Sequence, residues 1–595
     1  MKTIQHIGLG LFIIALLIFT AILGIGHQQL SEDVLNIENQ YDKTAILKAA
    51  NADGLIDAKL SSIAFISKLK KTLNTAAQDL EAQAKNGIPE GVGEWDFKMG
   101  DWKVTEYVGS IVKSTANGPV QDSPWLFFML TFGLAIIGGL LFILPKFSDH
   151  AGIKHNGIYH NTLTRGLDFS VKMLYLIPAV IGVLIYGFVK LQNLFWPLVT
   201  LAIAGLISYL VFYRQQSKDN TPQRNSNPVH TGWLGVIAGT YLIGFYILLY
   251  WAPSYINNWI AMVSPMSESL SGNGASQWFL YGLMYTIIVI VMGIRMMSKY
   301  QHNKYQRIRT MSVMFFQTAF AFLIPEILVR LNQPWYDFKN IWPLDYDFFF
   351  KYNIDELVNS GGLGIFMLVW GIALIIIGIP FITYFFGKRW YCSWVCGCGG
   401  LAETLGDPFR QLSDKSMRAW KYERFIIHGV LAAAVIMTAM VLFHFFTGTN
   451  QVLGLNTENV KSWYGFLIGA GFSGVVGTGF YPIMGNRVWC RFGCPLAAYL
   501  GLVQRFKSRF RITTNGGQCI SCGNCSTYCE MGIDVRSYAQ KGQDIVRNSC
   551  VGCGVCSAVC PRGVLRLENA SGDIDVRTED MRTIHITEDQ VTLLS

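Results

Sequence analysis

The sequence predicts an all-α polytopic membrane protein with about ten transmembrane helices and a small α+β domain near its C-terminus. Of its 595 residues, 51% are hydrophobic and 15% charged, and the mean hydropathy is +0.32. These values exclude a disordered chain and argue against an ordinary soluble enzyme. All thirteen cysteines fall between Cys392 and Cys560. This clustering indicates a cofactor site, since the disulfides of a small secreted domain would spread through the chain.

Ten nearly uncharged apolar stretches are long enough to cross a bilayer as helices, which requires about 20 residues. They occupy residues 7–25, 124–144, 170–189, 194–213, 231–251, 278–296, 311–329, 362–386, 425–446 and 463–484. The first resembles a signal sequence because Lys2 precedes it, but it is long and no small-x-small cleavage site follows. We therefore predict a transmembrane anchor over residues 1–26.

Basic residues are distributed unevenly between the connecting segments. If the N-terminus is cytoplasmic, the inward segments carry Lys146, Lys154, Arg165, Arg214, Lys218, Arg224, Lys299, Lys304, Arg307, Arg309 and those from Lys388 to Arg424. The outward segments carry few: residues 252–277 none, 331–360 only Lys339 and Lys351, and 448–462 only Lys461. The positive-inside rule then predicts a bacterial inner-membrane protein with both termini and every cysteine in the cytoplasm.

The remaining boundaries follow from changes in polarity. Residues 27–122 are polar with apolar residues at helical spacing, which predicts a periplasmic helical domain that acts as a cap or docking surface. Residues 123–360 hold transmembrane helices without an assigned role, and residues 361–512 hold helices with two cysteine elements. Residues 513–568 form the cysteine-rich soluble domain, and residues 569–595 form a C-terminal tail.

The soluble domain contains two cysteine quartets with the spacing C-x2-C-x2-C-x3-C, which is typical of bacterial ferredoxins with two [4Fe–4S] clusters. In that arrangement three thiolates of one loop bind one cluster and the fourth cysteine binds the other. We therefore assign Cys519, Cys522, Cys525 and Cys560 to one cluster, and Cys550, Cys553, Cys556 and Cys529 to the other. Two zinc sites are the alternative, but two equal quartets and the closing Cys560-Pro561 favour iron.

Two local expectations accompany these motifs. The fourth cysteine of each quartet is expected to open a short helix. Glu530 stands where a proline usually follows the fourth cysteine, and since proline is not a ligand, we expect the cluster to form without it.

Four further cysteines form two pairs, Cys392-Ser-Trp-Val-Cys396 and Cys490-Arg-Phe-Gly-Cys494, each directly after an apolar stretch. Their surroundings repeat with an offset of 98 residues, since Gly387-Lys-Arg-Trp-Tyr-Cys392 parallels Gly485-Asn-Arg-Val-Trp-Cys490. At spacing i, i+4 on a helix the two thiols face one way, so both pairs together could bind one metal or a third cluster. Redox thiols and buried thiols without a role are the alternatives. Cys398 has no twin in the repeat and is a candidate spare ligand.

The two pairs followed by the two quartets resemble the NosR/NapH-type membrane polyferredoxins over residues 362–565. The resemblance implies C-x-x-x-C-P elements at helix ends and electron movement between the quinone pool or cytoplasm and periplasmic respiratory reductases. A related copper-handling branch supports oxidase assembly. The chain departs from the pattern at Gly397, which replaces the proline of the first element, and it lacks a flavin-attachment sequence of the NosR kind.

Ionisable residues within spans are further candidates, because they are costly in a bilayer. Glu326 lies one turn before Arg330, and we favour an ion pair at the helix end over a proton acceptor for quinol. His428 and His444 are 16 residues apart, about 24 Å on one helix, and cannot share a heme. His230 is the one obvious heme partner for His428, but interfacial histidines without heme are favoured.

The sequence thus predicts a membrane-bound electron-transfer protein that connects a cytoplasmic or quinol donor with a respiratory reductase or oxidase. It would act as an oxidoreductase subunit with two [4Fe–4S] clusters, a third centre or redox thiols at the paired cysteines, and quinone as a candidate ligand. The lipid bilayer explains the net charge of +9 and the basic run of residues 505–511, so nucleic acid is not expected as a partner. A copper-reducing assembly factor for a metalloenzyme and a membrane redox regulator are the alternatives.

Overall fold

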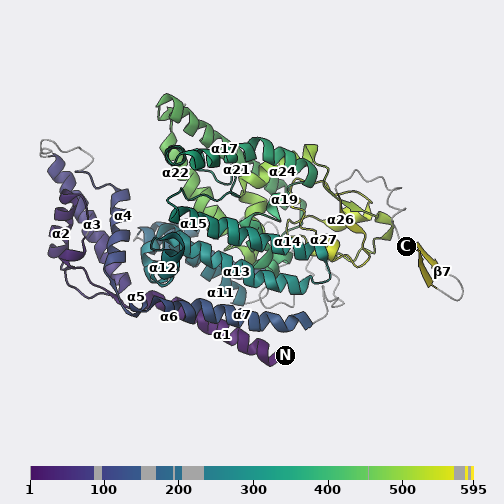
Figure 1. The fold of residues 1–595 in the computed structure, drawn as a ribbon, viewed down its shortest axis with the longest axis horizontal. Helices are drawn as coiled ribbons and strands as arrows, with labels where there is room; N and C mark the ends of the chain where they lie inside the picture. Colours follow the sequence, from purple (N-terminus) through teal and green to yellow (C-terminus); the bar gives the residue numbers. More distant parts are fainter. Residues whose placement is uncertain are drawn as a thin grey trace.

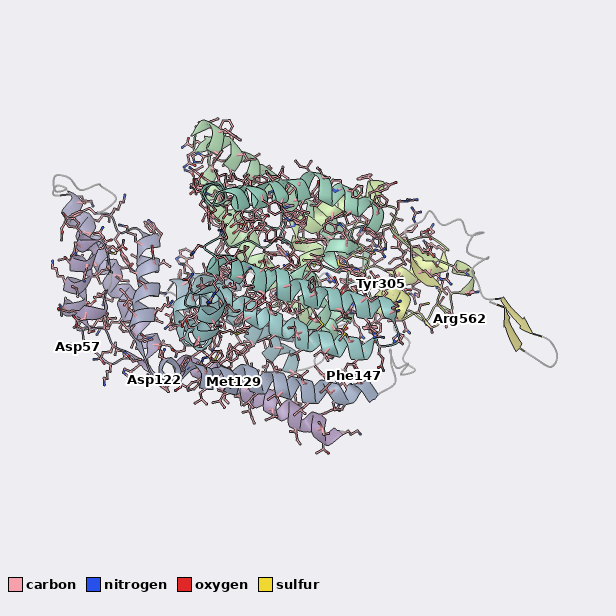
Figure 2. All side chains as sticks on the ribbon, in the orientation of Figure 1. Asp57, Asp122, Met129, Phe147, Tyr305 and Arg562 are labelled. Carbon is pink, nitrogen blue, oxygen red and sulfur yellow. The ribbon has the colours of Figure 1, made fainter. Side chains whose placement is uncertain are left out.

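The computed structural model describes residues 2–35, 37–85, 97–148, 169–191, 195–203, 233–452, 454–568, 583–586 and 591–594. The molecule is elongated, with a small helical domain at one end, long apolar helices in the middle and the cysteine-rich domain at the other end (Figure 1). Asp57 of the helical domain and Arg562 of the cysteine-rich domain mark these opposite ends (Figure 2). The two polar domains therefore lie on opposite sides of the apolar layer.

Seven helices among the described residues are long and apolar enough to cross a membrane. Their bounds are Lys2–Gly24, Pro124–Phe147, Leu234–Trp251, Gln277–Lys299, Lys304–Arg330, Gly362–Phe386 and Met417–Thr447. These are α1 (Lys2–Ala21) with η1 (Ile22–Gly24); α6 (Pro124–Phe128), η3 (Met129–Gly133) and α7 (Leu134–Ile143); α11 (Trp233–Trp251); α13 (Gln277–Lys299); α14 (Lys304–Phe315), η7 (Phe316–Leu323) and α15 (Ile324–Arg330); α17 (Gly362–Ala373), η8 (Leu374–Gly378) and α18 (Ile379–Phe386); and α21 (Met417–Thr447). The chain is a multi-pass membrane protein.

The predicted count of about ten spans is not confirmed. The predicted span 170–189 is helical as α8 (Phe169–Tyr186), but its apolar part is the shorter Leu176–Lys190. Most of the predicted span 194–213 lies outside the described residues. The predicted span 463–484 is interrupted by a turn after Val476, because α22 (Thr457–Tyr464) and the π-helical η10 (Gly465–Val476) end before α23 (Tyr481–Met484).

The helical domain contains α2 (Gln40–Ala52), α3 (Ser62–Lys85) and α4 (Asp101–Ser114). Leu55, Phe65, Leu69 and Leu73 are fully buried in its core. The strands β1 (His27–Gln28) and β2 (Ala116–Asn117) pair antiparallel where the chain enters and leaves this domain. The pairing joins the domain to the ends of its two flanking membrane helices.

The segment between α15 and α16 (Lys351–Asn359) differs from its prediction as a short outward loop. Trp342 donates its indole N–H to Thr438 Oγ1 at 3.0 Å, well inside the length of α21, and Tyr336 donates to the Met367 carbonyl at 3.0 Å. Lys339 is nearly buried and forms an ion pair with Asp337 at 3.0 Å. The segment therefore folds into the helix bundle, where its aromatic residues donate hydrogen bonds to α21 and α17.

The cysteine elements adjoin two of the membrane helices. After α18 come α19 (Arg389–Cys392), α20 (Gly397–Thr404) and the 3-10 helix η9 (Asp407–Leu412); after α23 come the π-helical η11 (Trp489–Gly493) and α24 (Pro495–Lys507). The C-terminal domain is closed by β5 (Arg511–Thr514) and β6 (Leu565–Glu568), which pair antiparallel around α25 (Asn524–Thr527), α26 (Val535–Gln540) and α27 (Val555–Ala558). The tail adds the hairpin β7 (Thr583–Ile586) and β8 (Val591–Leu594).

The first membrane helix packs tightly against α7, and the two lie side by side in Figure 1. A Cβ atom at Gly8 would lie 2.6 Å from the Gly138 carbonyl oxygen, and one at Gly138 would lie 2.7 Å from the Gly8 oxygen. Small residues allow membrane helices to approach this closely. This contact gives α1 a place in the bundle.

Gly8→Ala is therefore expected to push α1 away from α7 and to lower the stability of the protein by about 1–3 kcal/mol, the usual cost of overpacking. The measurement is the thermal unfolding midpoint in detergent. Gly10→Ala is the matched control on the same helix, because the space around Gly10 is open. Equal midpoints for the two variants would contradict the packing of α1 on α7.

Candidate iron–sulfur centres

The first predicted ligand set meets in one place. Its four cysteines and Pro561 line a small cavity in the C-terminal domain: Cys519, Cys522, Cys525 and Cys560. Cys560 comes from the second quartet, so the structure brings together the crossed set that the motif predicts. The second set is similarly close, since the thiol of Cys556 interacts electrostatically with those of Cys553, Cys550 and Cys529.

Short helices shape both cysteine loops. Gly523 and Gly554 precede α25 and α27 with φ angles of 79° and 72°, a left-handed conformation that favours glycine. Cys529 and Cys560 follow these helices, so the prediction that the fourth cysteine opens a helix is wrong. The turn after Cys529 instead directs the Ile533 amide to its sulfur at 3.4 Å.

Burial affects the pKa of several of these thiols. Burial, with nearby thiols, raises the pKa of Cys525 to about 12, and burial raises the pKa of Cys550 to about 11. Cysteine binds metal as thiolate, and a bound cation offsets the cost of burying that charge. Sets of four buried or half-buried thiols with amide donors suit an iron–sulfur cluster, which would supply one-electron transfer when bound.

The paired cysteines also meet as a group of four. Cys494 interacts electrostatically with Cys490, Cys396 and Cys392, and all four side chains are buried. The 98-residue repeat extends to the backbone, since Gly387 and Gly485 both have positive φ angles, 63° and 94°. Two copies of one turn therefore place two cysteine pairs around a common point.

Each pair spans a turn between helices, so the prediction that both thiols project from one helix is wrong. Cys392 ends α19, whereas Cys396 is the extended residue before α20. Cys490 lies in η11, and Cys494 is the extended residue before α24. The Ala497 amide donates to Cys494 Sγ at 3.4 Å. Burial and the neighbouring thiols raise the pKa of Cys494, and the Ala497 amide partly opposes this effect.

Cys396 has a corresponding environment with one addition. Hydrogen bonds from the Cys398 thiol and from the Gly399 amide lower the pKa of Cys396 to about 6, against the opposing effect of burial. Cys398, which the sequence left as a spare ligand, therefore contacts Cys396 directly.

Gly397 replaces the proline of the pattern at a place where two polar side chains come close to the backbone. A Cβ atom there would lie 2.8 Å from Gln317 Oε1 and 3.7 Å from Lys339 Nζ. Gly397 thus leaves room for two polar groups that come from η7 and from the inward-folded segment.

A network of buried charges joins the two cysteine regions. Arg487 donates to Cys490 Sγ at 3.6 Å and to the Cys392 carbonyl at 3.1 Å, and it also pairs with Glu403 and, at 3.0 Å, with Glu530. Glu530 lies beside Cys529 in the C-terminal domain. One arginine therefore contacts the paired cysteines and the neighbour of a ferredoxin-type cysteine.

Other elements complete this network. Arg309 pairs with Glu403, and Arg410 pairs with Glu530 at 3.0 Å and with Asp407 at 3.3 Å. Arg295 and Lys299 also pair with Asp407, at 3.0 and 2.9 Å. Across these pairs, five cations meet three carboxylates. The cationic excess lies where clusters with thiolate ligands would add negative charge.

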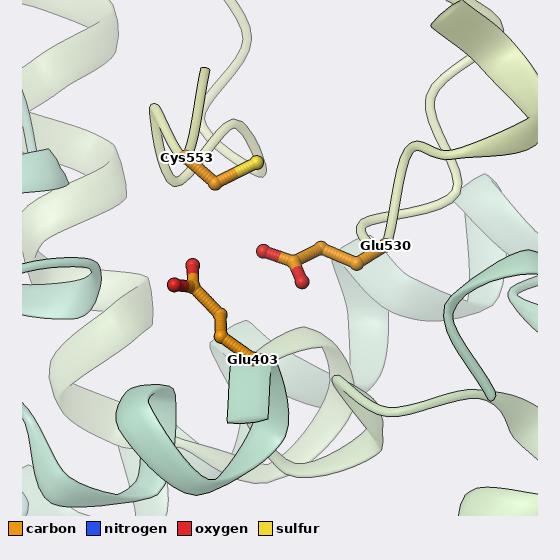
Figure 3. A group of neighbouring side chains, drawn as sticks. All are labelled: Glu403, Glu530 and Cys553. Carbon is orange, nitrogen blue, oxygen red and sulfur yellow. The ribbon is translucent and has the colours of Figure 1, made fainter. Parts of the chain in front are cut away.

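The carboxylates of Glu403 and Glu530 and the thiol of Cys553 point toward one another, with ligand atoms within 4.8 Å (Figure 3). Three such groups could hold a metal cation. Here arginines already pair with both carboxylates, and Cys553 belongs to a cysteine quartet. The arrangement is therefore an ion-pair network rather than a separate metal site.

Glu530 explains the second departure from the sequence pattern. Its side chain is fully buried, and Arg410 and Arg487 overcome the effect of burial and lower its pKa to about 2. The residue replaces the usual proline with a charge that pairs with the membrane portion. The C-terminal domain is held there as well by Ser393, Tyr305 and Gln306, which donate to the carbonyls of Val551, Gly552 and Cys553 at 2.8–3.0 Å. Figure 2 shows Tyr305 at this boundary.

The intramembrane candidates have different outcomes. Arg330 donates to the Ser269 carbonyl at 2.7 Å, and Glu326 lies within hydrogen-bonding reach of Ser271 and Trp335, so the favoured Glu326–Arg330 ion pair is wrong. His428 contacts the Arg424 carbonyl of its own helix at 2.6 Å. His230 lies outside the described residues, and a heme pairing with it stays untested.

Comparison with known proteins identifies iron–sulfur domains in both cysteine regions. Residues 368–416 and 464–513 each match a family described as 4Fe-4S binding domain, and residues 518–565 match one described as 4Fe-4S dicluster domain. The first family thus matches both copies of the repeat. The chain contains [4Fe–4S] domains, and the paired cysteines lie within them.

Two curated proteins are similar to parts of the chain. It is 26% identical over 163 residues to the "Putative electron transport protein YccM" of Escherichia coli (strain K12), over 26% of this chain and 44% of the relative. It is 27% identical over 187 residues to the "Methylamine utilization ferredoxin-type protein MauN" of Paracoccus denitrificans (strain Pd 1222), over 29% of this chain and 59% of the relative. The chain therefore spans about half the length of these relatives. No solved structure matches.

The matches and the apolar helices together indicate a membrane protein with [4Fe–4S] domains, similar in part to proteins that are named for electron transport. The crossed ligand sets can be tested by alanine substitution. Cys560→Ala should abolish the same paramagnetic resonance signal as Cys522→Ala, and Cys529→Ala the same signal as Cys553→Ala. If Cys560→Ala instead removed the signal lost in Cys553→Ala, each quartet would bind its own cluster and the crossed assignment would be wrong.

Glu530→Gln removes the buried carboxylate charge that pairs with Arg410 and Arg487. Losing one partner of a buried ion pair costs about 3–5 kcal/mol, and the unfolding of the C-terminal domain should be easier by roughly this amount. Guanidinium titration of the full-length protein in detergent, followed by cluster absorbance, measures the change. Glu458→Gln is the control, because that carboxylate forms an exposed ion pair with Lys461 and such pairs contribute about 0–1 kcal/mol. Equal midpoints would contradict a structural role of Glu530.

Proposed function

We propose that this chain is a NosR/NapH-type polyferredoxin that passes electrons between a cytoplasmic or quinol donor and a respiratory reductase or oxidase. The observation that carries the proposal is the position of Arg487, which contacts the paired cysteines on one side and Glu530, next to Cys529, on the other. Arg487 and Glu530 therefore connect the paired cysteines with the residue next to Cys529, so that redox centres at these two sites would lie close to one another. The relatives named for electron transport support the same role.

Three [4Fe–4S] clusters account for twelve of the thirteen cysteines. We assign the first two to the crossed quartets and the third to Cys392, Cys396, Cys490 and Cys494. The amides at Cys494 and Cys529 and the guanidinium of Arg487 then stabilise negative charge at the sulfurs, which favours the reduced state of a cluster. The helices around the third set exclude water, since all four of its thiols are buried.

The proposed location is the bacterial inner membrane, with ten spans and both termini in the cytoplasm. The basic residues of the inward segments support this orientation. The helical domain of residues 27–122 then lies in the periplasm, opposite the clusters, where it would meet a respiratory partner. In this orientation the paired cysteines are the cluster ligands nearest to the apolar layer.

A double variant tests the third centre. Cys392→Ala with Cys490→Ala should lose one cluster's iron and sulfide and keep the two ferredoxin-type signals, while electron delivery from reduced ferredoxin domain to membrane quinone should fall at least tenfold. Anaerobic iron and sulfide analysis, resonance spectra and single-turnover kinetics give the three readouts. Cys398→Ala should keep all the iron, because Cys398 contacts Cys396 but is not one of the four assigned ligands. A double variant with unchanged iron and unchanged kinetics would exclude the paired cysteines as a relay.

A further inference from the structure

A cavity of about 780 Å³ lies inside the membrane portion. Its lining runs from the paired cysteines Cys396 and Cys490 to Glu326 in α15 and to Trp335 in the segment that follows α15. Cavities of about 300–1,000 Å³ suit small organic ligands. The cavity therefore has the size of a cofactor or substrate site and ends directly at a proposed cluster.

The end at the cysteines is polar. Gln317 is almost fully buried and donates to Thr286 Oγ1 at 3.3 Å, while its amide oxygen faces Gly397. The Lys339 ammonium approaches the same glycine and pairs with Asp337. Gly397, by lacking a side chain, keeps a donor and an acceptor available beside Cys396.

The other end offers a carboxylate. Glu326 lines the cavity together with Ser271 and Trp335, both within its hydrogen-bonding reach. Because Arg330 donates elsewhere, no cation neutralises Glu326 among the described residues of the cavity lining. A carboxylate in this position can take up and release a proton.

The walls between the two ends are aromatic and irregular. Tyrosine rings line them, including Tyr250, Tyr281 and Tyr285, with the last two centroids 5.5 Å apart. Both η7 and η10 are π-helical where they line the cavity. Such irregular turns occur frequently at functional sites. Flat aromatic walls with polar groups at the ends fit a planar ligand with oxygens on opposite edges.

We propose that this cavity binds the ring of a membrane quinone or quinol, with Lys339 and Gln317 at the oxygen nearest the paired cysteines. This inference rests on the proposed electron-transfer function and assigns its membrane substrate to one site. The bound quinol loses two electrons and two protons and becomes the quinone. Clusters held at the cysteine sites would accept these electrons one at a time, and the protons would leave by way of Glu326; the reverse reaction would take up the same electrons and protons.

Menadione, a soluble naphthoquinone, is a suitable probe of the full-length protein in lipid nanodiscs. Its Kd is measured by quenching of tryptophan fluorescence, since Trp278, Trp335 and Trp489 line the cavity. A second readout is the rate at which menadione reoxidises clusters that dithionite has reduced. Gln317→Leu and Gly397→Ala should each weaken binding about tenfold. Glu326→Gln should leave the Kd within twofold and slow reoxidation about tenfold.

Glu268→Gln is the matched control, because Glu268 is an exposed carboxylate on α12 (Asn257–Ser271) that does not line the cavity. It should change neither readout, and iron content should stay equal in all variants. Equal Kd values for wild type, Gln317→Leu and Gly397→Ala would overturn the cavity as the quinone site. If menadione failed to bind but the reduced clusters still passed electrons to a soluble protein acceptor, the electron-transfer function would stand without it. Absence of clusters in the wild type would refute that function itself.

Discussion

The buried ion-pair network around Arg487 and Glu530 is the interaction on which the arrangement of the cysteine sites depends. Isolated charges are very costly in a protein interior, so each must meet a partner of opposite sign. Here the partners come from α13, α14, α20, η9, the second cysteine repeat and the C-terminal domain. Satisfying them requires all six elements to be in place together, which fixes the ferredoxin-type domain against the helix ends.

The features of the fold that depend on short, continuous segments of the sequence could be predicted from it. Apolar length predicts the seven clearest spans, and cysteine spacing predicts the crossed set in which Cys560 meets Cys519 and its neighbours. Each signal is local, because a span is one continuous stretch and a cluster loop is one short motif. The 98-residue repeat also holds in three dimensions, down to the positive φ angles of Gly387 and Gly485.

The rest depended on contacts between distant segments. Arg309 and Lys299 read as ordinary inward-facing charges, but both are paired in the buried network. Glu530 read as a harmless departure, because nothing near it in the sequence indicates Arg410 or Arg487. Lys339 was predicted to be an outward-facing charge, because it lies between two apolar stretches. Nothing in the sequence indicates that this segment folds back into the helix bundle. In each case the missing information was a partner that only the fold supplies.

The two departures from the repeated pattern have a common meaning. If two equivalent halves of a repeat bind one cluster, ligand binding alone does not require the halves to differ. The second half has the usual proline, Pro495, after Cys494. In the first half of the repeat, Gly397 replaces the proline, and the side chains of Gln317 and Lys339 lie next to it at the end of the cavity. In the C-terminal domain, Glu530 replaces another proline, and its carboxylate pairs with Arg487, which also contacts Cys490. The first change leaves room beside Cys396, which lines the cavity together with Cys490, and the second pairs with Arg487, which contacts Cys490. The paired cysteines therefore lie between the cavity and the ferredoxin-type domain.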